Sequence, residues 1–284
     1  MDYIQISFDI SPKDPWTEVI TQELAEIDFE SFTEENQKLQ AYISANNFKE
    51  DILNKLIEAY TEKNVKITTS KHIIPAQNWN AVWESDYQPV EIGKELIIRA
   101  PFHPEDNSFA ISVEIQPQMS FGTGHHQTTY LLSQVILNLD LKGKSVLDVG
   151  TGTGVLGILA SKLGATNVFG TDIEEGAVEN AIENCERNRT TNFSIVKGDI
   201  DVVPRNQYDV IFANINKNVL LKHMEAYSNL IIDNGLLLLS GFFETDIQSI
   251  TDKAKLHCFD VIEILNKEKW AVLKLKKQCN HESN

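Results

Sequence analysis

Residues 146–154 read V-L-D-V-G-T-G-T-G, an apolar stretch that ends in an acid and then turns through three glycines. A strand followed by such a turn is typical of a loop whose backbone approaches a ligand, because glycine has no Cβ to collide with that ligand. Asp148 can accept hydrogen bonds from the glycine amides or from an ammonium group of the ligand. The pattern therefore predicts a binding loop that includes Gly150 and Gly152.

The same segment allows a second interpretation, because Gly152, Gly154 and Gly157 also satisfy the dinucleotide fingerprint G-x-G-x-x-G. In that fingerprint the first glycine directly follows the strand, whereas here Gly150 takes this position and Gly152 comes later. Asp172 closes the next expected strand and suits both interpretations, since an acid there binds ribose hydroxyls. Its structural alternative is a helix N-cap. A nicotinamide-dependent oxidoreductase is thus kept as an alternative function.

Two further segments carry polar side chains that can act on a ligand. Asn214, in the A-N-I segment 213–215, offers one acceptor and two donors at the end of an expected strand, where it can orient an amine or simply form a turn. Residues 120–129 read S-F-G-T-G-H-H-Q-T-T. His125 and His126 have no acidic or cysteine partner at metal-ligand spacing, so we expect them to stabilise the loop rather than bind a metal.

The elements that would position these residues alternate from residue 139 onward in the pattern of a parallel sheet. Strands are expected at 145–149, 167–171, 193–197, 209–213 and 235–240, and helices near 155–163, 175–188, 218–231 and 244–256. Segments 259–265 and 269–275 read as an antiparallel hairpin at one edge. The expected fold class is α/β, a doubly wound and mostly parallel sheet with a C-terminal hairpin, as in class I methyltransferases.

The first part of the chain has a different construction. Residues 1–92 contain no glycine, and residues 1–70 hold 14 Asp and Glu against 6 Lys and no Arg, a net charge of −8. Strand and helix periodicities over these 70 residues follow the order β-α-β-β-α-β, which predicts a small α+β ferredoxin-like domain. We therefore expect an acidic substrate-recognition domain at 1–70, a linker at 71–92 and the binding domain at 93–284.

Composition restricts the partners and the location of the protein. The 25 Lys and Arg against 41 Asp and Glu give a net charge of −16, which repels phosphate backbones and favours a basic partner over direct nucleic acid binding. The sequence contains no run of about 18 apolar residues, so it predicts no membrane-spanning helix. The N-terminus has no export signal, and Cys185, Cys258 and Cys279 form no C-x-x-C pair. These features favour a cytoplasmic protein with reduced thiols.

The motifs together resemble those of the PrmA family of ribosomal protein methyltransferases. The block F-G-T-G-x-H-x-T-T, the loop D-x-G-x-G-x-G, the strand-end acid and A-N-I recur in order, firmly over residues 75–275 and less so over the first 70. The resemblance implies S-adenosylmethionine as cofactor, with Thr129 at its methionine part, Gly150 as the first glycine of the binding loop and Asp172 at the ribose. It also implies Asn214 in the site, and it suggests Asp199 at the adenine amino group.

The resemblance further implies methyl transfer to lysine side-chain and N-terminal amines of a basic large-subunit ribosomal protein. Asn214 is the candidate for orienting the amine, and no residue is a compelling general base. Gln127 and Asn216 depart from the family, which often has proline and an apolar residue there. Two alternatives beside the oxidoreductase stay open: a methyltransferase acting on another amine or a nucleic acid base, and a cofactor-binding module without catalysis.

Overall fold

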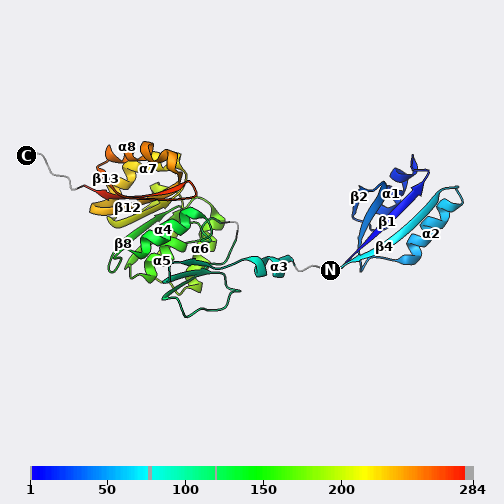
Figure 1. The fold of residues 1–284 in the computed structure, drawn as a ribbon, viewed down its shortest axis with the longest axis horizontal. Helices are drawn as coiled ribbons and strands as arrows, with labels where there is room; N and C mark the ends of the chain where they lie inside the picture. The colour runs from blue at the N-terminus through cyan, green and yellow to red at the C-terminus, as the bar shows by residue number, and fades with distance from the viewer. Residues whose placement is uncertain (1, 76–78, 119, 279–284) are drawn as a thin grey trace, which may run out of the picture. The chain divides into compact units, whose positions relative to one another are not determined.

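The computed structural model describes residues 2–75, 79–118 and 120–278. The chain divides into two compact units, Met1–Asp86 and Tyr87–Asn284 (Figure 1). This division falls inside the linker expected at 71–92. Within the described ranges, no helix combines the length and apolar character that a membrane crossing requires.

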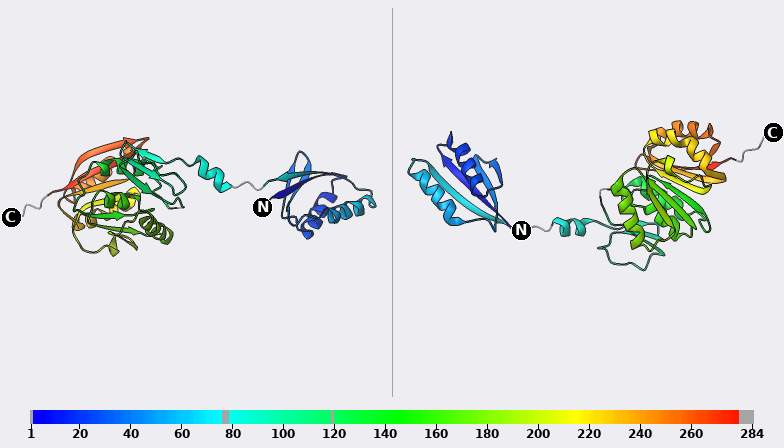
Figure 2. Two further views of the ribbon diagram at one scale, coloured as in Figure 1. Left: turned by 90° about the horizontal axis from the view of Figure 1, so that it is seen from below. Right: turned by 180° about the vertical axis from the view of Figure 1, so that it is seen from behind.

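The first unit contains one antiparallel sheet with strand order β2-β3-β1-β4. Its elements are β1 (Tyr3–Ser11), α1 (Trp16–Glu26), β2 (Ser31–Glu35), β3 (Lys38–Ser44), α2 (Glu50–Thr61) and β4 (Lys66–Ile74). Alternate residues of β1, from Ile4 to Ile10, are buried against Ile20 and Leu24 of α1, because successive strand side chains point to opposite faces. Both helices lie on one side of the sheet (Figure 2). The ferredoxin-like prediction is confirmed.

Two elements of this unit differ from the sequence prediction. The β-branched residues of 65–69 predict a shorter strand, whereas β4 runs to Ile74, because its pairing with β1 continues until Tyr3 lies opposite Ile74. Almost all its side chains are at least partly exposed, so no apolar alternation marks its second half. Helix α3 (Trp79–Asp86) lies within the expected linker, where the sequence has no clean helical period.

The second unit is built on a seven-stranded sheet with order β10-β9-β8-β11-β12-β14-β13. Its strands are β8 (Ser145–Val149), β9 (Asn167–Asp172), β10 (Phe193–Lys197), β11 (Tyr208–Asn214), β12 (Ile231–Phe243), β13 (Phe259–Lys267) and β14 (Trp270–Lys277). Neighbours from β10 to β12 are parallel, and the hairpin of β13 and β14 is antiparallel. The predicted doubly wound, mostly parallel sheet with a terminal hairpin is confirmed.

Helices cover both faces of this sheet (Figure 1). They are α4 (Gln127–Leu137), α5 (Val155–Lys162), α6 (Glu175–Arg187), α7 (Lys217–Leu230) and α8 (Ile247–Lys255). Adjacent residues of β8 divide between two cores, since Val146 packs with residues of α4 and α5 and Leu147 with residues of α7 and α8. The central strands are therefore buried on both sides, which explains their nearly continuous apolar sequence.

Helix α4 was not expected from the sequence. Its buried residues include Thr128, Thr129 and Ser133 as well as leucines, valine and isoleucine, so the helix has no polar stripe to reveal its period. The His126 side chain caps the helix by accepting from the backbone N–H of Thr128 at 3.3 Å. This buried helix carries Thr129, one of the predicted site residues.

A small sheet of β5 (Val90–Ile92), β6 (Leu96–Arg99) and β7 (Ile111–Glu114) precedes α4. The sequence pattern predicts strands at 95–100 and 109–115, where β6 and β7 lie as a parallel pair, while β5 falls in the expected linker. Of the cysteines, Cys185 and Cys258 are free thiols, and Cys279 lies outside the described residues. Burial raises the pKa of the Cys185 thiol to about 12, so this thiol is protonated and unreactive.

Candidate functional site

A cavity of about 640 Å³ lies at the carboxyl ends of β8, β9 and β11. The sheet order changes direction here, since β9 and β11 flank β8 on opposite sides, and open α/β sheets bind ligands at such a position. Five predicted site residues line the cavity: Gly150, Gly152, Asp172, Asp199 and Asn214. The fold thus brings together residues that lie up to 64 positions apart in the sequence.

The two loop glycines adopt left-handed backbone conformations, with φ of +72° at Gly150 and +55° at Gly152. A Cβ at Gly150 would lie 2.3 Å from Cγ2 of Ile215, and one at Gly152 would lie 2.1 Å from the carbonyl oxygen of Phe121. The sequence reasoning attributed these glycines to the approach of a ligand. The structure adds a second reason, because protein atoms from two other motifs occupy the space that a Cβ would need.

Asp148 lies behind the loop and is only 1% exposed. Its Oδ2 accepts a hydrogen bond from Oγ1 of Thr151 at 2.7 Å and one from the amide of Gly157 at 3.2 Å. Burial raises the pKa of this carboxyl to about 6, although both hydrogen bonds act in the opposite direction. Asp148 does not line the cavity, so of its two expected roles the structure supports the one of holding the loop backbone.

Asp172 ends β9 and faces the cavity with its carboxylate oriented by two backbone amides. Oδ2 accepts from Gly152 N at 2.9 Å, and Oδ1 accepts from Glu174 N at 3.1 Å. The N-cap of α6 is Glu174, so Asp172 does not have the capping role that was its alternative. Each carboxylate oxygen keeps a lone pair that can accept a further hydrogen bond from a ligand hydroxyl.

Asp199 follows β10, the neighbour of β9, and lines the same cavity, and two basic side chains lie close to its carboxylate. Its Oδ1 caps the short helix η1 (Ile200–Val202) through the amide of Ile200 at 2.8 Å. Nε2 of the buried His223 lies 3.3 Å from the same oxygen, and Lys222 Nζ lies 3.7 Å from Oδ2. Burial lowers the pKa of His223, while Asp199 opposes that shift.

Asn214 and Thr129 come together although they are 85 residues apart. Nδ2 of Asn214 donates to Oγ1 of Thr129 at 3.5 Å, and Thr129 is fully buried on α4 behind the cavity lining. Oδ1 of Asn214 is buried and has no hydrogen-bond partner within the described chain. A buried acceptor without a partner at a cavity wall leaves room for a ligand donor, such as an amine.

Apolar side chains form walls that sequence reasoning missed. Ile173 is 64% exposed and Phe121 is 50% exposed, and both line the cavity together with Ile215 and Val219. Large exposed apolar side chains in a concave site suit a flat or aliphatic ligand part. Phe121, Ile173 and Ile215 are sequence neighbours of Gly122, Asp172 and Asn214, which was the available signal, whereas Val219 had no such signal.

His125 and His126 contact protein groups around the loop of residues 120–126. Besides capping α4, His126 packs its ring against Phe121 at 4.9 Å and Trp270 at 4.7 Å between ring centroids. Nε2 of His125 lies 2.9 Å from the carbonyl oxygen of Gln88. These contacts agree with the expected loop-stabilising role. Among the residues with described positions, no group of three or more His, Cys, Asp or Glu is arranged to hold a metal ion.

Comparisons with known proteins identify relatives of nearly the whole chain. The model of the family described as ribosomal protein L11 methyltransferase (PrmA) matches residues 10–278. A ribosomal protein L11 methyltransferase from Porphyromonas gingivalis is 38% identical over 282 residues, covering 96% of this chain and 97% of that protein. One from Phocaeicola vulgatus is 35% identical over 277 residues, covering 96% and 99%.

Solved structures agree with this similarity. A crystal structure of a ribosomal protein L11 methylase from Lactobacillus delbrueckii subsp. bulgaricus has a TM-score of 0.63 and 26% identity. The match covers 68% of this chain and 100% of that chain. A methyltransferase from Pyrococcus furiosus, with a TM-score of 0.51 and 22% identity, shares the fold over 59% of this chain and 90% of its own.

Proposed function

Since the chain belongs to the ribosomal protein L11 methyltransferase (PrmA) family, we propose that it transfers methyl groups from S-adenosylmethionine to amines of ribosomal protein L11. The family match spans residues 10–278 and so includes both units of the chain. The observation that carries the proposal is the cavity at the end of β8, β9 and β11, where Asn214 keeps an unpartnered acceptor beside the glycine loop. Oxidoreductase chemistry is not favoured by this family.

We assign the cofactor contacts from the chemistry of the lining. Asp172, oriented by two amides, would accept hydrogen bonds from the ribose hydroxyls, and Asp199 would accept one from the adenine amino group. Ile173, which follows Asp172 in the chain and also lines the cavity, would offer an apolar surface to the adenine ring. Gly150 and Gly152 would face the methionine part, with Asn214 held in place by Thr129.

In this proposal Asp148 binds only other protein groups and does not contact the cofactor. It holds the loop through Thr151 and Gly157 and so fixes the backbone of the glycines that face the cofactor. A carboxyl with a pKa of about 6 is mostly ionised at neutral pH, and both of its hydrogen-bond donors favour that ionised form.

The methyl group of S-adenosylmethionine is activated by the sulfonium, so the remaining task of the protein is alignment of an in-line displacement. A lysine amine with a pKa near 10.4 is neutral in about one molecule in 2,500 at pH 7, whereas an α-amine near 7.8 is neutral in about one in seven. The N-terminal amine of the substrate is the easier acceptor. For lysine, desolvation inside the cavity would lower the pKa of the amine. Asn214 would orient either amine through its free Oδ1.

We further propose that residues 1–70 present the substrate. Their net charge of −8 suits a basic protein, and the chain as a whole, at −16, is unsuited to direct contact with nucleic acid. Residues 71–92 would serve as the linker and 93–284 as the catalytic domain. A cytoplasmic location fits a ribosomal substrate.

The test incubates the protein with labelled S-adenosylmethionine and L11 lacking methyl groups, then locates the label by mass spectrometry. Label on lysine or N-terminal amines of L11 is the expected result. Label on another amine or on RNA, with L11 unlabelled, would favour the alternative acceptors. Thermal stabilisation by NAD but not by S-adenosylmethionine would contradict the cofactor assignment, since a ligand stabilises the fold it binds.

A further inference from the structure

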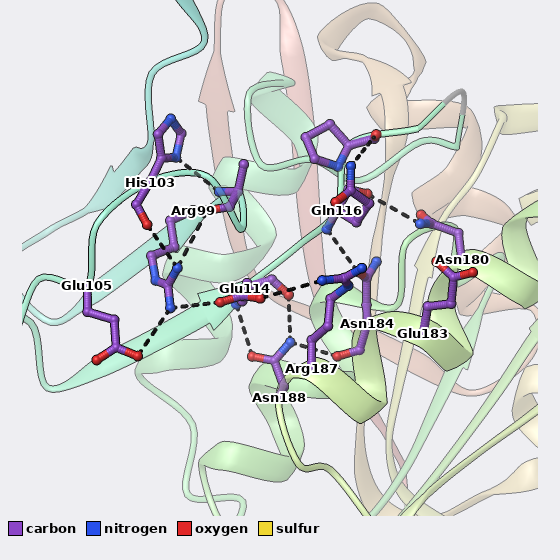
Figure 3. A network of polar contacts seen from close by, with 12 residues as sticks. Arg99, His103, Glu105, Glu114, Gln116, Asn180, Glu183, Asn184, Arg187 and Asn188 are labelled. Carbon is purple, nitrogen blue, oxygen red and sulfur yellow. Dashed lines mark hydrogen bonds and ion pairs between the residues drawn. The ribbon is translucent and has the colours of Figure 1, made fainter. Parts of the chain in front are cut away.

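Three asparagines lie one helical turn apart along one face of α6: Asn180, Asn184 and Asn188, the last at its C-cap. Asn180 and Asn184 are fully buried. Figure 3 shows the three side chains directed toward the extended segment around Glu114 and Gln116, which begins in β7. Strand β7 is an edge of its small sheet, so its outer backbone groups have no strand partner.

The asparagine side chains take the place of that missing strand. Asn188 exchanges two hydrogen bonds with the backbone of Glu114, accepting from its N–H at 2.9 Å and donating to its carbonyl at 2.6 Å. Asn184 accepts from Gln116 N at 2.8 Å, and Asn180 donates to Gln116 O at 3.3 Å. Residues four apart on a helix rise by about 6 Å, close to the ~6.6 Å between alternate residues of a strand.

Asn184 differs from its two neighbours because its amide also reaches the glycine loop. Nδ2 of Asn184 donates to the carbonyl of Thr153 at 3.0 Å. Thr153 in turn binds the F-G-T-G motif twice, donating from its backbone N–H to Phe121 O at 2.9 Å and from Oγ1 to Gly122 O at 2.7 Å. Thr153 is therefore hydrogen-bonded directly to Phe121, and it is linked to Gln116 through the side chain of Asn184.

Phe121 and the preceding Ser120 matter for the site because both line the cavity. Thr153 binds Phe121 and Gly122 directly, and Asn184 links Thr153 to Gln116. Loss of the Asn184 contacts would let Ser120 and Phe121 move relative to the glycine loop. A displacement of about 1 Å is enough to impair the alignment of the reacting groups.

We propose that Asn184 is a positioning residue for the methyl transfer, setting the cofactor-facing wall at Ser120 and Phe121 against the glycine loop. Asn184 is outside the cavity lining and acts only through Gln116 and Thr153. The inference rests on the proposed function in one respect, that S-adenosylmethionine occupies this cavity. The other reading is that all three asparagines only stabilise the edge of β7.

The two readings predict different results for Asn184→Ala and Asn188→Ala in the full chain. Asn184→Ala loses two side-chain hydrogen bonds to backbone groups and Asn188→Ala loses three, so both variants are expected to lower the melting temperature. Positioning predicts that only Asn184→Ala raises the calorimetric Kd for S-adenosylmethionine, by at least about tenfold, with less than about twofold for Asn188→Ala. Equal Kd values for the two variants would overturn the proposal.

Asn184→Asp gives a second measurement, which stays informative even if Asn184→Ala does not fold. A protonated carboxyl can accept from Gln116 N and donate to Thr153 O, whereas the ionised form has no donor and faces a carbonyl oxygen. Affinity for S-adenosylmethionine, relative to the wild type, is therefore expected to recover as the pH falls from 8 to about 5.5. A ratio that stays constant with pH would contradict a role for the Thr153 contact.

Failure of the inference is distinguishable from failure of the proposed function. Wild-type protein that binds S-adenosylmethionine and methylates L11, with Asn184→Ala equal to Asn188→Ala, refutes only the positioning role. Wild-type protein that binds no S-adenosylmethionine refutes the cofactor assignment, and with it the premise of the inference.

Discussion

At the scale of single residues, Asp172 is the acid whose geometry most depends on the glycine loop. Replacing Asp172 by Ala removes the acceptor of the Gly152 and Glu174 amides as well as the proposed ribose contact. We expect the Kd for S-adenosylmethionine to rise by at least about tenfold, which corresponds to about 1.4 kcal/mol. Isothermal titration measures it, with Asp201→Ala as the control, since this exposed acid does not line the cavity. An unchanged Kd for Asp172→Ala would remove the ribose assignment.

The buried carboxyl of Asp148 predicts a pH dependence of stability. Its pKa in the folded protein, about 6, is above the unfolded value of 3.8, so the folded state binds this proton more tightly. The contribution to the free energy of unfolding is therefore fully present below about pH 3.8 and is lost as the pH rises toward 6.

Asp148→Asn tests this prediction, because an amide oxygen can still accept from Thr151 and Gly157 without becoming charged. Urea denaturation at several pH values between 4 and 7 is expected to show a smaller loss of stability with rising pH in the variant than in the wild type. Parallel curves for the two proteins would mean that Asp148 is not the group responsible.

At the scale of elements, the start of α4 offers a substitution that should stabilise the protein. Gln127 is the first residue of the helix, where proline is well tolerated, and the preceding His126 is already extended with φ −72° and ψ 139°. Gln127→Pro loses an exposed hydrogen bond to Glu268 and reduces the entropy of the unfolded chain. We expect a gain of about 0.5 kcal/mol, measured by chemical denaturation.

Thr128→Pro is the matched control for that substitution. The backbone N–H of Thr128 donates to His126 Nδ1 at 3.3 Å, so proline one position later removes the cap of α4. It should destabilise the protein, and stabilisation by both prolines would show that the capping contact contributes little.

Elements were predictable where one physical signal dominated. Strands β8 and β10 have the bounds expected from their apolar runs, because each is bounded by turn residues. Helix α4 was missed since it is buried on nearly every side, and β4 was cut short because it is exposed on nearly every side. Periodicity identifies elements with one apolar and one polar face. Helix α4 lacks a polar face and strand β4 lacks an apolar one.

The same limit applies to the site. Motifs placed Gly150, Asp172, Asp199 and Asn214 around one cavity, because strand ends of a parallel sheet meet at one edge. Spacing alone did not reveal that Asp148 points behind the loop. Nor did it reveal the asparagines of α6, whose partners include backbone groups 64 to 74 residues earlier and, for Asn184, the carbonyl of Thr153, 31 residues earlier; backbone groups carry no residue-specific signal.

At the scale of the whole molecule, we expect cofactor binding to reside in the second unit and substrate presentation in the first. A chain of residues 87–284 keeps both cores of the large sheet and every residue that lines the cavity. We expect it to bind S-adenosylmethionine with the Kd of the full chain and to lose methylation of L11. Filter binding and labelled-methyl transfer measure the two properties, and full transfer to L11 by residues 87–284 would refute the presentation role of the first unit.

Salt provides a second test of the same division. Attraction between an acidic domain and a basic protein is screened as the Debye length falls from about 10 Å at 0.1 M to about 3 Å at 1 M. The KM for L11 is therefore expected to rise with ionic strength while the Kd for S-adenosylmethionine changes little. A salt-independent KM would assign the acidity of residues 1–70 to solubility alone.

The exposed apolar walls of the cavity have a calorimetric consequence. Ile173 and Phe121 are 64% and 50% exposed in the structure, so a ligand that covers them removes apolar surface from water. Burial of such surface gives a negative change in heat capacity. The binding enthalpy of S-adenosylmethionine should therefore become more exothermic as the temperature rises, and the slope should flatten when Ile173 is replaced by serine.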